Sequence, residues 1–274
     1  WLKPHFSTAS AFAVGNATLD PLGASVTASP YDYDYEISPR IWIGNRCPGG
    51  TGWRARYWLY DHQVASSSFV NTGTGLAAVS LTVPGLNVPL ISPSLGPALT
   101  TAHALDLETI DLEATRDLTI GCSVLRVSGG VRYLDMSQFY TAVVRGADVT
   151  VAALSYQQHF EGIGPTFGLE FGHDLGCSVS FYAHARGSVL FGNRNDQIQG
   201  TLLVPVVANV LVDSPHSDNV LSIGELGIGV EANLGSVFAR LGYEGQIWWG
   251  AGGPTDGTAD LGLHGFSVTT GVMF

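Results

Sequence analysis

Long apolar runs are missing from this chain of 274 residues, although 45% of its residues are hydrophobic. A membrane-spanning helix needs about 20 consecutive, mostly apolar residues, and the longest such run, residues 202–212, is interrupted by Pro205 and Asn209. Spanning helices are therefore excluded. A closed β-barrel is the other structure that satisfies every backbone polar group in lipid. The soluble alternative, a β-sandwich, usually carries more charge than the 13% found here.

Positive charge is also scarce. Twelve Lys and Arg against 23 Asp and Glu give a net charge of −11, and Lys3 is the only lysine. This balance excludes nucleic acid as a partner and leaves no basic patch for a membrane surface. Nearly all positive charge is arginine, whose planar guanidinium pairs carboxylates bidentately and suits fixed ion pairs in a confined interior.

Metal and catalytic motifs are absent. The three cysteines, Cys47, Cys122 and Cys177, are too scattered for a zinc site, and their odd number leaves at least one unpaired if a disulfide forms. Two hypotheses stay open for them, cross-linking to another molecule or free thiols. Asp61 and His62 are neighbours, but adjacent residues on a strand point to opposite faces and cannot cooperate. We therefore predict that the protein is not an enzyme and needs no cofactor or metal.

Alternation with a period of two runs through most of the chain. Between Tyr31 and Ile43, tyrosines and isoleucines occupy one parity while Asp32, Asp34 and Glu36 occupy the other. The pattern predicts strands with a lipid-facing apolar side and a wet interior, in which arginines of one strand oppose acids of the next. The apolar parity slips by one near Thr109, where we expect a β-bulge.

The fold class predicted is a single all-β domain, residues 1–274, forming an antiparallel up-and-down transmembrane barrel of about ten strands. The first strand is placed at residues 4–14; counting residues 149–160 and 202–212 as separate strands gives twelve. Short turns at residues 44–52, 117–123, 173–176 and 235 fall at one end, which is periplasmic in such barrels. Long extracellular loops are expected at about residues 61–103, 136–160 and 192–219.

The polar parities of these strands carry the candidate lumen-lining residues. They are Asp32, Asp34, Glu36, Arg40, Arg54, Arg56, Asp106, Glu108, Arg126, Arg132, Glu170, Arg186, Glu225, Glu231, Arg240 and Glu244. Two functions compete for this set. In a narrow pore the charged groups line water and sort ions; in a structural barrel they pair across the interior and fill it.

Short segments spread over nearly the whole chain resemble the Legionella-type major outer membrane protein family. They are Leu2-Lys3-Pro4, residues 40–44, Arg56-Tyr57-Trp58 to His62, residues 105–108, residues 130–133, the run from Phe160 to Pro165 with Gly168, and the terminal Phe274. The resemblance implies an outer-membrane barrel with a porin-like or structural role and brings no catalytic residues. It favours the narrow pore, a passive channel for small hydrophilic solutes or ions, over the structural barrel. The uncommon lysine and the long Ser66 to Thr101 segment depart from the family pattern, so pore size and solute stay open.

Resemblance to outer-membrane barrels also gives the last strand a role. Its alternate residues Phe266, Val268, Thr270, Val272 and Phe274 form the pattern that the barrel-assembly machinery recognises. We therefore expect export with removal of a signal peptide that would precede Trp1. The expected partners are outer-membrane lipid, the assembly machinery and further copies of the chain, as a homo-oligomer or a lattice.

Overall fold

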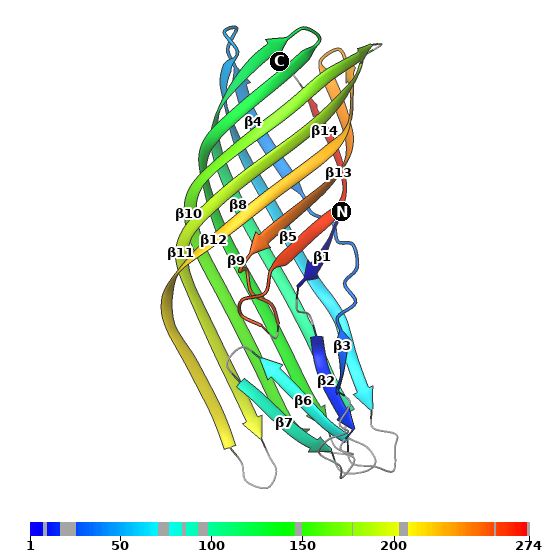
Figure 1. The fold of residues 1–274 in the computed structure, drawn as a ribbon, viewed down its shortest axis with the longest axis vertical. Coiled ribbons are helices and arrows are strands. Elements are labelled where there is room, and N and C mark those ends of the chain that lie inside the picture. The colour runs from blue at the N-terminus through cyan, green and yellow to red at the C-terminus, as the bar shows by residue number, and fades with distance from the viewer. Residues whose placement is uncertain are drawn as a thin grey trace.

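A computed structural model describes the backbone of residues 1–7, 10–16, 26–70, 77–83, 86–92, 98–145, 150–176, 178–202, 208–254 and 256–272. The elements in these ranges are all strands (Figure 1). Within these ranges there is no helix with the length and hydropathy required to cross a membrane.

Ten strands form one antiparallel sheet in which neighbours in space are mostly neighbours in sequence. Their order is β1 (Leu2–Phe6), β14 (Leu261–Val272), β13 (Val237–Trp249), β12 (Ala208–Leu234), β11 (Val179–Leu202), β10 (Thr150–Gly176), β9 (Ser123–Arg145), β8 (Ala98–Ile120), β5 (Thr51–Val70) and β4 (Arg40–Arg46). The predicted all-β, up-and-down sheet of ten strands is confirmed.

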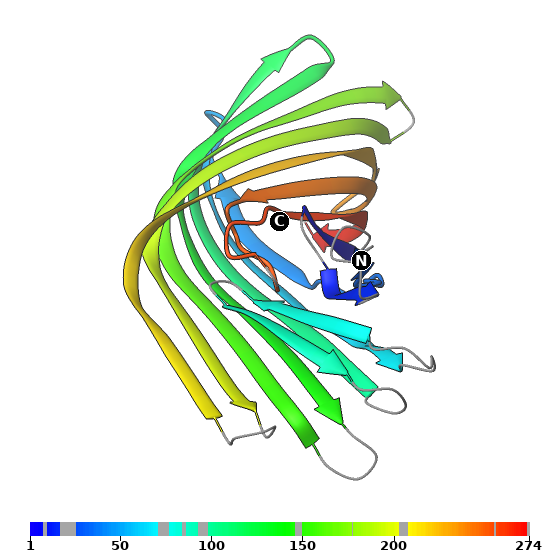
Figure 2. The same cartoon turned by 60° about the horizontal axis from the view of Figure 1, so that its bottom comes forward.

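The sheet is strongly rolled, and its two edges meet at one place (Figure 2). Leu2 and Glu36 exchange two backbone hydrogen bonds of 2.9 Å, which link β1 to the segment before β4. Among the described residues no longer ladder joins β1 to β4, so the hydrogen-bonded sheet is not closed.

Short turns gather at one end of the sheet, at the top of Figure 1. They include residues 47–50, 121–122 and 235–236. Two of these are two-residue hairpin turns whose first residue, Gly121 or Gly235, has a φ of 61° or 70°, a left-handed conformation that glycine adopts without steric cost. We call this the turn end, and the opposite end the distal end.

The strands are longer than predicted. β10 and β12 each have 27 residues, whereas a transmembrane strand needs about 9–11. The described residues of the loops expected at 61–103, 136–160 and 192–219 lie in strands, namely the distal halves of β5, β8, β9, β10, β11 and β12, and also β6 (Ala77–Val83) and β7 (Leu86–Ser92). Residues 71–76, 84–85, 93–97, 146–149 and 203–207 of these ranges lie outside the described residues. The loop prediction is therefore wrong for the described residues, because their polar composition conceals continuous pairing with long neighbouring strands.

Two other strand predictions need correction. Residues 4–14 divide between β1 and β2 (Ser10–Asn16), and β2 belongs to a second sheet with β3 (Val26–Pro30), β6 (Ala77–Val83) and β7 (Leu86–Ser92). That sheet lies near the distal end (Figure 1). The strand predicted at residues 31–43 is regular only from Arg40, and residues 31–39 contribute the single bridge at Glu36.

One row of outward side chains divides the sheet into two halves of opposite polarity. Cross-strand pairing places its members side by side on six strands; this boundary row is Tyr57, Ile110, Tyr133, Ile163, Phe191 and Val220. Towards the turn end the outer face exposes large apolar residues such as Leu112, Phe167, Leu226 and Val268. One step towards the distal end, the outer face carries Glu108, Asp135 and Glu161 in register.

The inner face also changes at the boundary row, but there the distal half is apolar and the turn half is charged. In the distal half the inward residues are apolar and buried, among them Leu105, Leu107, Leu134, Met136 and Phe160. In the turn half they are charged.

The register between β8 and β9 runs through Asp106 to Ile110 without a shift, so the predicted bulge is wrong. The parity appeared to slip because the two faces exchange their chemistry there.

Candidate functional site

The charged residues of the turn half lie on the concave face of the rolled sheet. Their ion pairs join strands that are not neighbours, which only a concave face allows: Arg40 of β4 pairs with Glu244 of β13 at 3.1 Å, and Arg132 of β9 pairs with Glu225 of β12 at 2.5 Å. Twelve of the sixteen candidate residues are on this face. They are Glu36, Arg40, Arg54, Arg56, Arg126, Arg132, Glu170, Arg186, Glu225, Glu231, Arg240 and Glu244.

Asp111 is at the centre of this ion-pair network. It is 0% exposed and accepts hydrogen bonds from Arg132 at 2.6 and 2.9 Å and from Arg186 at 3.2 Å. Glu113, one inward position further along β8, pairs with Arg54 at 2.8 Å and with Arg186 at 3.0 Å. Each buried acid is thus held by two guanidinium groups, an arrangement that offsets the large desolvation cost of buried charge.

A second set of pairs lies nearer the turn end. Glu170 contacts Arg54 at 2.6 Å and Arg126 at 3.6 Å. Asp117 accepts from Arg126 at 2.7 Å and also pairs with Arg46. Arg240 pairs with Glu231 across the β12–β13 hairpin. The network therefore runs from strand to strand around the interior of the turn half.

Four predicted lumen residues lie on the opposite face. Asp32, whose side chain is 98% exposed, and Asp34 point outwards, while Tyr31 and Tyr33 are buried. Asp106 and Glu108 point outwards from β8, between the buried Leu105, Leu107 and Thr109. The predictions for these four acids are wrong because all four lie distal to the boundary row, where the apolar face is the inner one.

Sequence reasoning missed the central acids Asp111, Glu113 and Asp117. The signal was present, because Ile110, Leu112 and Ala114 alternate with two of them and keep the parity of an outward apolar face. Because a bulge was assumed, the inward side of this strand was inferred from the distal Asp106 and Glu108, which point outwards. Asp117 was read as part of a turn, whereas it is still within β8.

A cavity of about 280 Å³ enters the interior from the turn end. Seven arginines line it, Arg40, Arg46, Arg54, Arg56, Arg126, Arg186 and Arg240, together with four acids, Glu170, Asp174, Glu231 and Glu244. At the mouth are the exposed residues Arg46 and Asp174. The cavity is lined by β4, β5, β9, β10, β11, β12, β13 and β14, so it lies within the rolled sheet.

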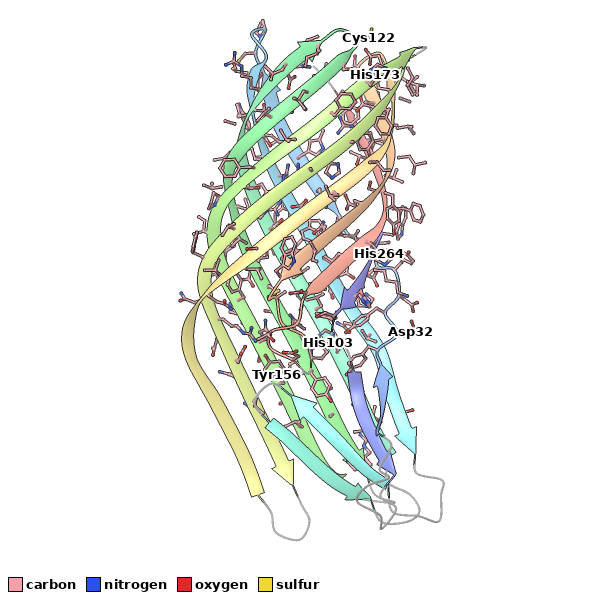
Figure 3. The ribbon with its side chains drawn as sticks, viewed as in Figure 1. Asp32, His103, Cys122, Tyr156, His173 and His264 are labelled. Atoms are coloured by element: carbon pink, nitrogen blue, oxygen red, sulfur yellow. The ribbon has the colours of Figure 1, made fainter. Side chains whose placement is uncertain are left out.

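The distal half is filled by an apolar core with a cluster of histidine and tyrosine side chains. Tyr33 Oη and His103 Nδ1 are 3.1 Å apart, and Phe6, Tyr31 and His62 pack around these two rings. Figure 3 shows His103 and Tyr156 in this half, far from Cys122 and His173 at the turn end. Burial lowers the pKa of His103 to about 3 and also lowers the pKa of His62. Both rings are therefore neutral at physiological pH.

The connection between β13 and β14, residues 250–260, folds onto the concave face (Figure 2); residue 255 lies outside the described residues. Ala251, 0% exposed, accepts hydrogen bonds from the side-chain amides of Gln138 at 3.2 Å and Gln158 at 2.5 Å. Arg194 donates to Gly257 O at 2.5 Å. Strands β9, β10 and β11 therefore hold this connection against the opposite wall of the sheet.

The other predicted groups give less chemistry. Cys47 and Cys122 are exposed free thiols at the turn end, and Cys177 lies outside the described residues. Asp61 is exposed while His62 is buried, so the two face opposite sides. Within the described ranges no three His, Cys, Asp or Glu side chains are grouped in a way that could hold a metal ion.

The last strand presents its predicted apolar side outwards. Phe266, Val268, Thr270 and Val272 are all exposed on the outer face of β14, whereas Phe274 lies outside the described residues. Recognition of these residues by an assembly machinery stays a prediction.

Comparison with known proteins identifies the family of this chain. No curated protein matches the chain. A family model described as the Legionella pneumophila major outer membrane protein precursor matches residues 49–274, which include every strand from β5 to β14. It describes an outer-membrane protein rather than an enzyme, which supports an outer-membrane location. The chain belongs to the Legionella major outer membrane protein family.

Proposed function

We propose that this protein is an outer-membrane β-barrel whose lumen is closed by its own side chains. The Leu2–Glu36 bridge brings the sheet edges together, and closure removes the unpaired edges that lipid does not tolerate. The outward apolar surface between the turn end and the boundary row is the lipid-facing band. The distal half, polar outside and apolar inside, extends beyond the membrane.

One observation carries the closed lumen: beyond the cavity at the turn end, side chains of the described residues occupy the interior. At the level of the lipid band the buried Asp111, Glu113, Arg132 and Arg186 pair across it. In the distal half an apolar core and the connection at residues 250–260 occupy it. Small barrels are filled by side chains in this way, whereas wide barrels hold an aqueous channel. The role that follows is that of a structural outer-membrane protein that transports no solute.

A porin-like channel for small solutes or ions is the second candidate. The arginine-lined cavity at the turn end favours it, since such a cavity is the beginning of a passage. Because Asp32 and Asp34 lie outside, the interior wall of this cavity is rich in arginine, and any conduction would favour anions.

Planar-bilayer conductance of the purified protein separates the two candidates. A closed barrel shows no conductance steps above background. A double variant, Gln138→Ala with Gln158→Ala, removes both amides that hold Ala251 and is expected to introduce brief openings. The control Gln157→Ala changes an exposed neighbour of Gln158 and should stay silent. Stable steps in the unmodified protein would replace the structural role with the channel.

The same geometry supports partner proposals. Outer-membrane lipid would surround the band from the boundary row to the turn end. The assembly machinery would engage the outer face of β14, including Phe266 and Val268. Further copies of the chain, as a homo-oligomer or a lattice, would meet through the outer surface, and blue native electrophoresis of the purified protein tests this.

A further inference from the structure

Arg56 is the exception within the charged interior. Six other arginines line the cavity, Arg40, Arg46, Arg54, Arg126, Arg186 and Arg240, and each has a carboxylate within 4.0 Å. Among the described residues, Arg56 forms no ion pair, and its buried Nε has no hydrogen-bond partner. A guanidinium with a free donor therefore faces the cavity.

The strand register explains why Arg56 lacks a partner. It lies directly opposite Asp111 in the β5–β8 ladder, but both oxygens of Asp111 are engaged, by Arg132 at 2.6 and 2.9 Å and by Arg186 at 3.2 Å. The strongest like-charge influences on Arg56 come from Arg186, Arg54 and Arg40. Arg186 adds a second free donor, since its own Nε is buried without a partner.

Asp111, Glu170 and Glu225 lie near Arg56, but each pairs with other arginines. A cation without its own ion pair inside a membrane barrel is costly unless an anion or water compensates it. Arginine side chains converging from β4, β5 and β11 offer planar N–H donors, the geometry that fits oxyanions. The cavity volume, about 280 Å³, is below the range of about 300–1,000 Å³ for drug-sized ligands. It therefore suits a small ion with a few waters.

We propose that this cavity is a binding site for a small phosphate-type oxyanion, which enters from the turn end and is held by Arg56 together with Arg40, Arg54 and Arg186. The anion supplies the direct ion pair that Asp111 does not form with Arg56. This site does not depend on whether the lumen conducts, since a closed barrel can hold the anion as part of its interior.

Thermal unfolding and equilibrium dialysis of the detergent-solubilised full chain test the site, with inorganic phosphate as the probe at constant ionic strength. The unmodified protein is expected to bind one phosphate per chain at millimolar concentrations and to unfold at a higher temperature when phosphate is present. Sodium chloride alone should not reproduce this shift. Absence of phosphate binding by the unmodified protein would overturn the proposal.

The variant Arg56→Gln separates binding from architecture. It removes an uncompensated charge, so without phosphate it should unfold at a temperature equal to or above that of the parent, while its phosphate affinity falls about tenfold or more. Arg56→Lys keeps the charge without the planar donors and should bind weakly. The matched control Arg116→Gln changes an exposed arginine on the other face of β8 and should bind like the parent. Undiminished binding by Arg56→Gln would refute the assignment.

A lipid source of phosphate is distinguished by a separate titration. Phosphatidylglycerol in mixed micelles carries a phosphate group attached to acyl chains. These chains cannot enter a cavity that eight strands line, so the phosphate of the lipid should not reach Arg56. We expect no Arg56-dependent stabilisation from the lipid. Stabilisation by the lipid and not by free phosphate would overturn the proposal of a soluble anion.

Discussion

At the scale of single residues, the interior charges are stable only as a set. Asp111 compensates both Arg132 and Arg186, and none of the three is appreciably exposed. Truncating one member of a buried ion pair leaves an uncompensated charge and typically costs about 3–5 kcal/mol.

We therefore expect Asp111→Ala to lower the free energy of unfolding by about 3–5 kcal/mol, measured by denaturant unfolding in detergent micelles. Asp32→Ala is the control: that side chain is 98% exposed, and its ion pair with Lys3 spans 3.8 Å. It should have little effect. Equal effects of the two variants would show that the network around Asp111 does not support the fold.

The histidines of the distal core predict a pH dependence. Burial holds the pKa of His103 near 3, below its ordinary value of 6.5, so the unfolded chain binds a proton between these values that the folded chain does not. Stability is therefore complete above about pH 6.5 and falls as the pH decreases. At pH 5 the loss is about 2 kcal/mol, because each pH unit costs about 1.4 kcal/mol. His62, whose pKa burial also lowers, acts in the same direction.

Unfolding measured between about pH 7.5 and pH 5 checks this expectation. Tyr31, Tyr33 and His62 surround His103, and none of them offers a negative charge to compensate a proton there. His103→Gln keeps a polar partner for Tyr33 but cannot titrate, so its stability should decrease less over this range. A variant that follows the parent throughout the range would exclude His103 as the cause.

At the scale of elements, close strand approach depends on particular glycines. A Cβ at Gly164 of β10 would collide with the carbonyl oxygen of Val189 on β11 and lie 2.9 Å from Leu190 Cα. Backbone atoms cannot move aside as a flexible side chain can. A Cβ at Gly187, on the neighbouring strand β11, would have no other atom within 4 Å.

Gly164→Ala should therefore destabilise the sheet by about 1–3 kcal/mol, the usual cost of overpacking, whereas Gly187→Ala should be nearly neutral. Heat-induced unfolding of both variants in the same detergent provides the comparison. A neutral Gly164→Ala would mean that β10 and β11 are further apart than the structure shows.

The elements also show what alternation can and cannot predict. The pattern identified correctly that Arg54 and Arg56 share a face opposite Tyr57, because a strand has a strict period of two. It could not tell which face is the inner one. Placing every apolar side chain on the outer face was correct at Phe167 and Leu169, which are exposed, and wrong at Tyr31 and Leu105, which belong to a core.

The pairing partners were also beyond sequence reasoning. That Arg132 reaches Glu225 follows from the curvature of the sheet, since β9 and β12 are separated by two strands. The connection at residues 250–260 is a further case. Its position inside the rolled sheet depends on Gln138 and Gln158, which are distant in sequence.

For the whole molecule, the proposed closure predicts a specific cross-link. Leu2 and Glu36 form a hydrogen-bonded antiparallel pair, with Cα atoms about 5.5 Å apart, a spacing that a disulfide accepts. In a background with all three native cysteines changed to serine, Leu2→Cys with Glu36→Cys should oxidise to an intramolecular disulfide, identified by mass spectrometry of the linked peptide. The control pair Leu2→Cys with Ile37→Cys points to opposite faces and should stay reduced. No disulfide in the first pair would argue for an open sheet.

The central claim is that lipid covers only the turn half and ends at the boundary row. A site-directed spin-label scan of β10 in liposomes tests it most directly, with single cysteines replacing Ser155, His159, Ile163, Phe167 and Phe171 in the same cysteine-free background. Oxygen reports lipid exposure and a water-soluble nickel chelate reports aqueous exposure. We expect labels at positions 155 and 159 to be exposed to water and labels at 163, 167 and 171 to be exposed to lipid. Uniform aqueous exposure along the strand, or lipid exposure extending to position 155, would contradict it.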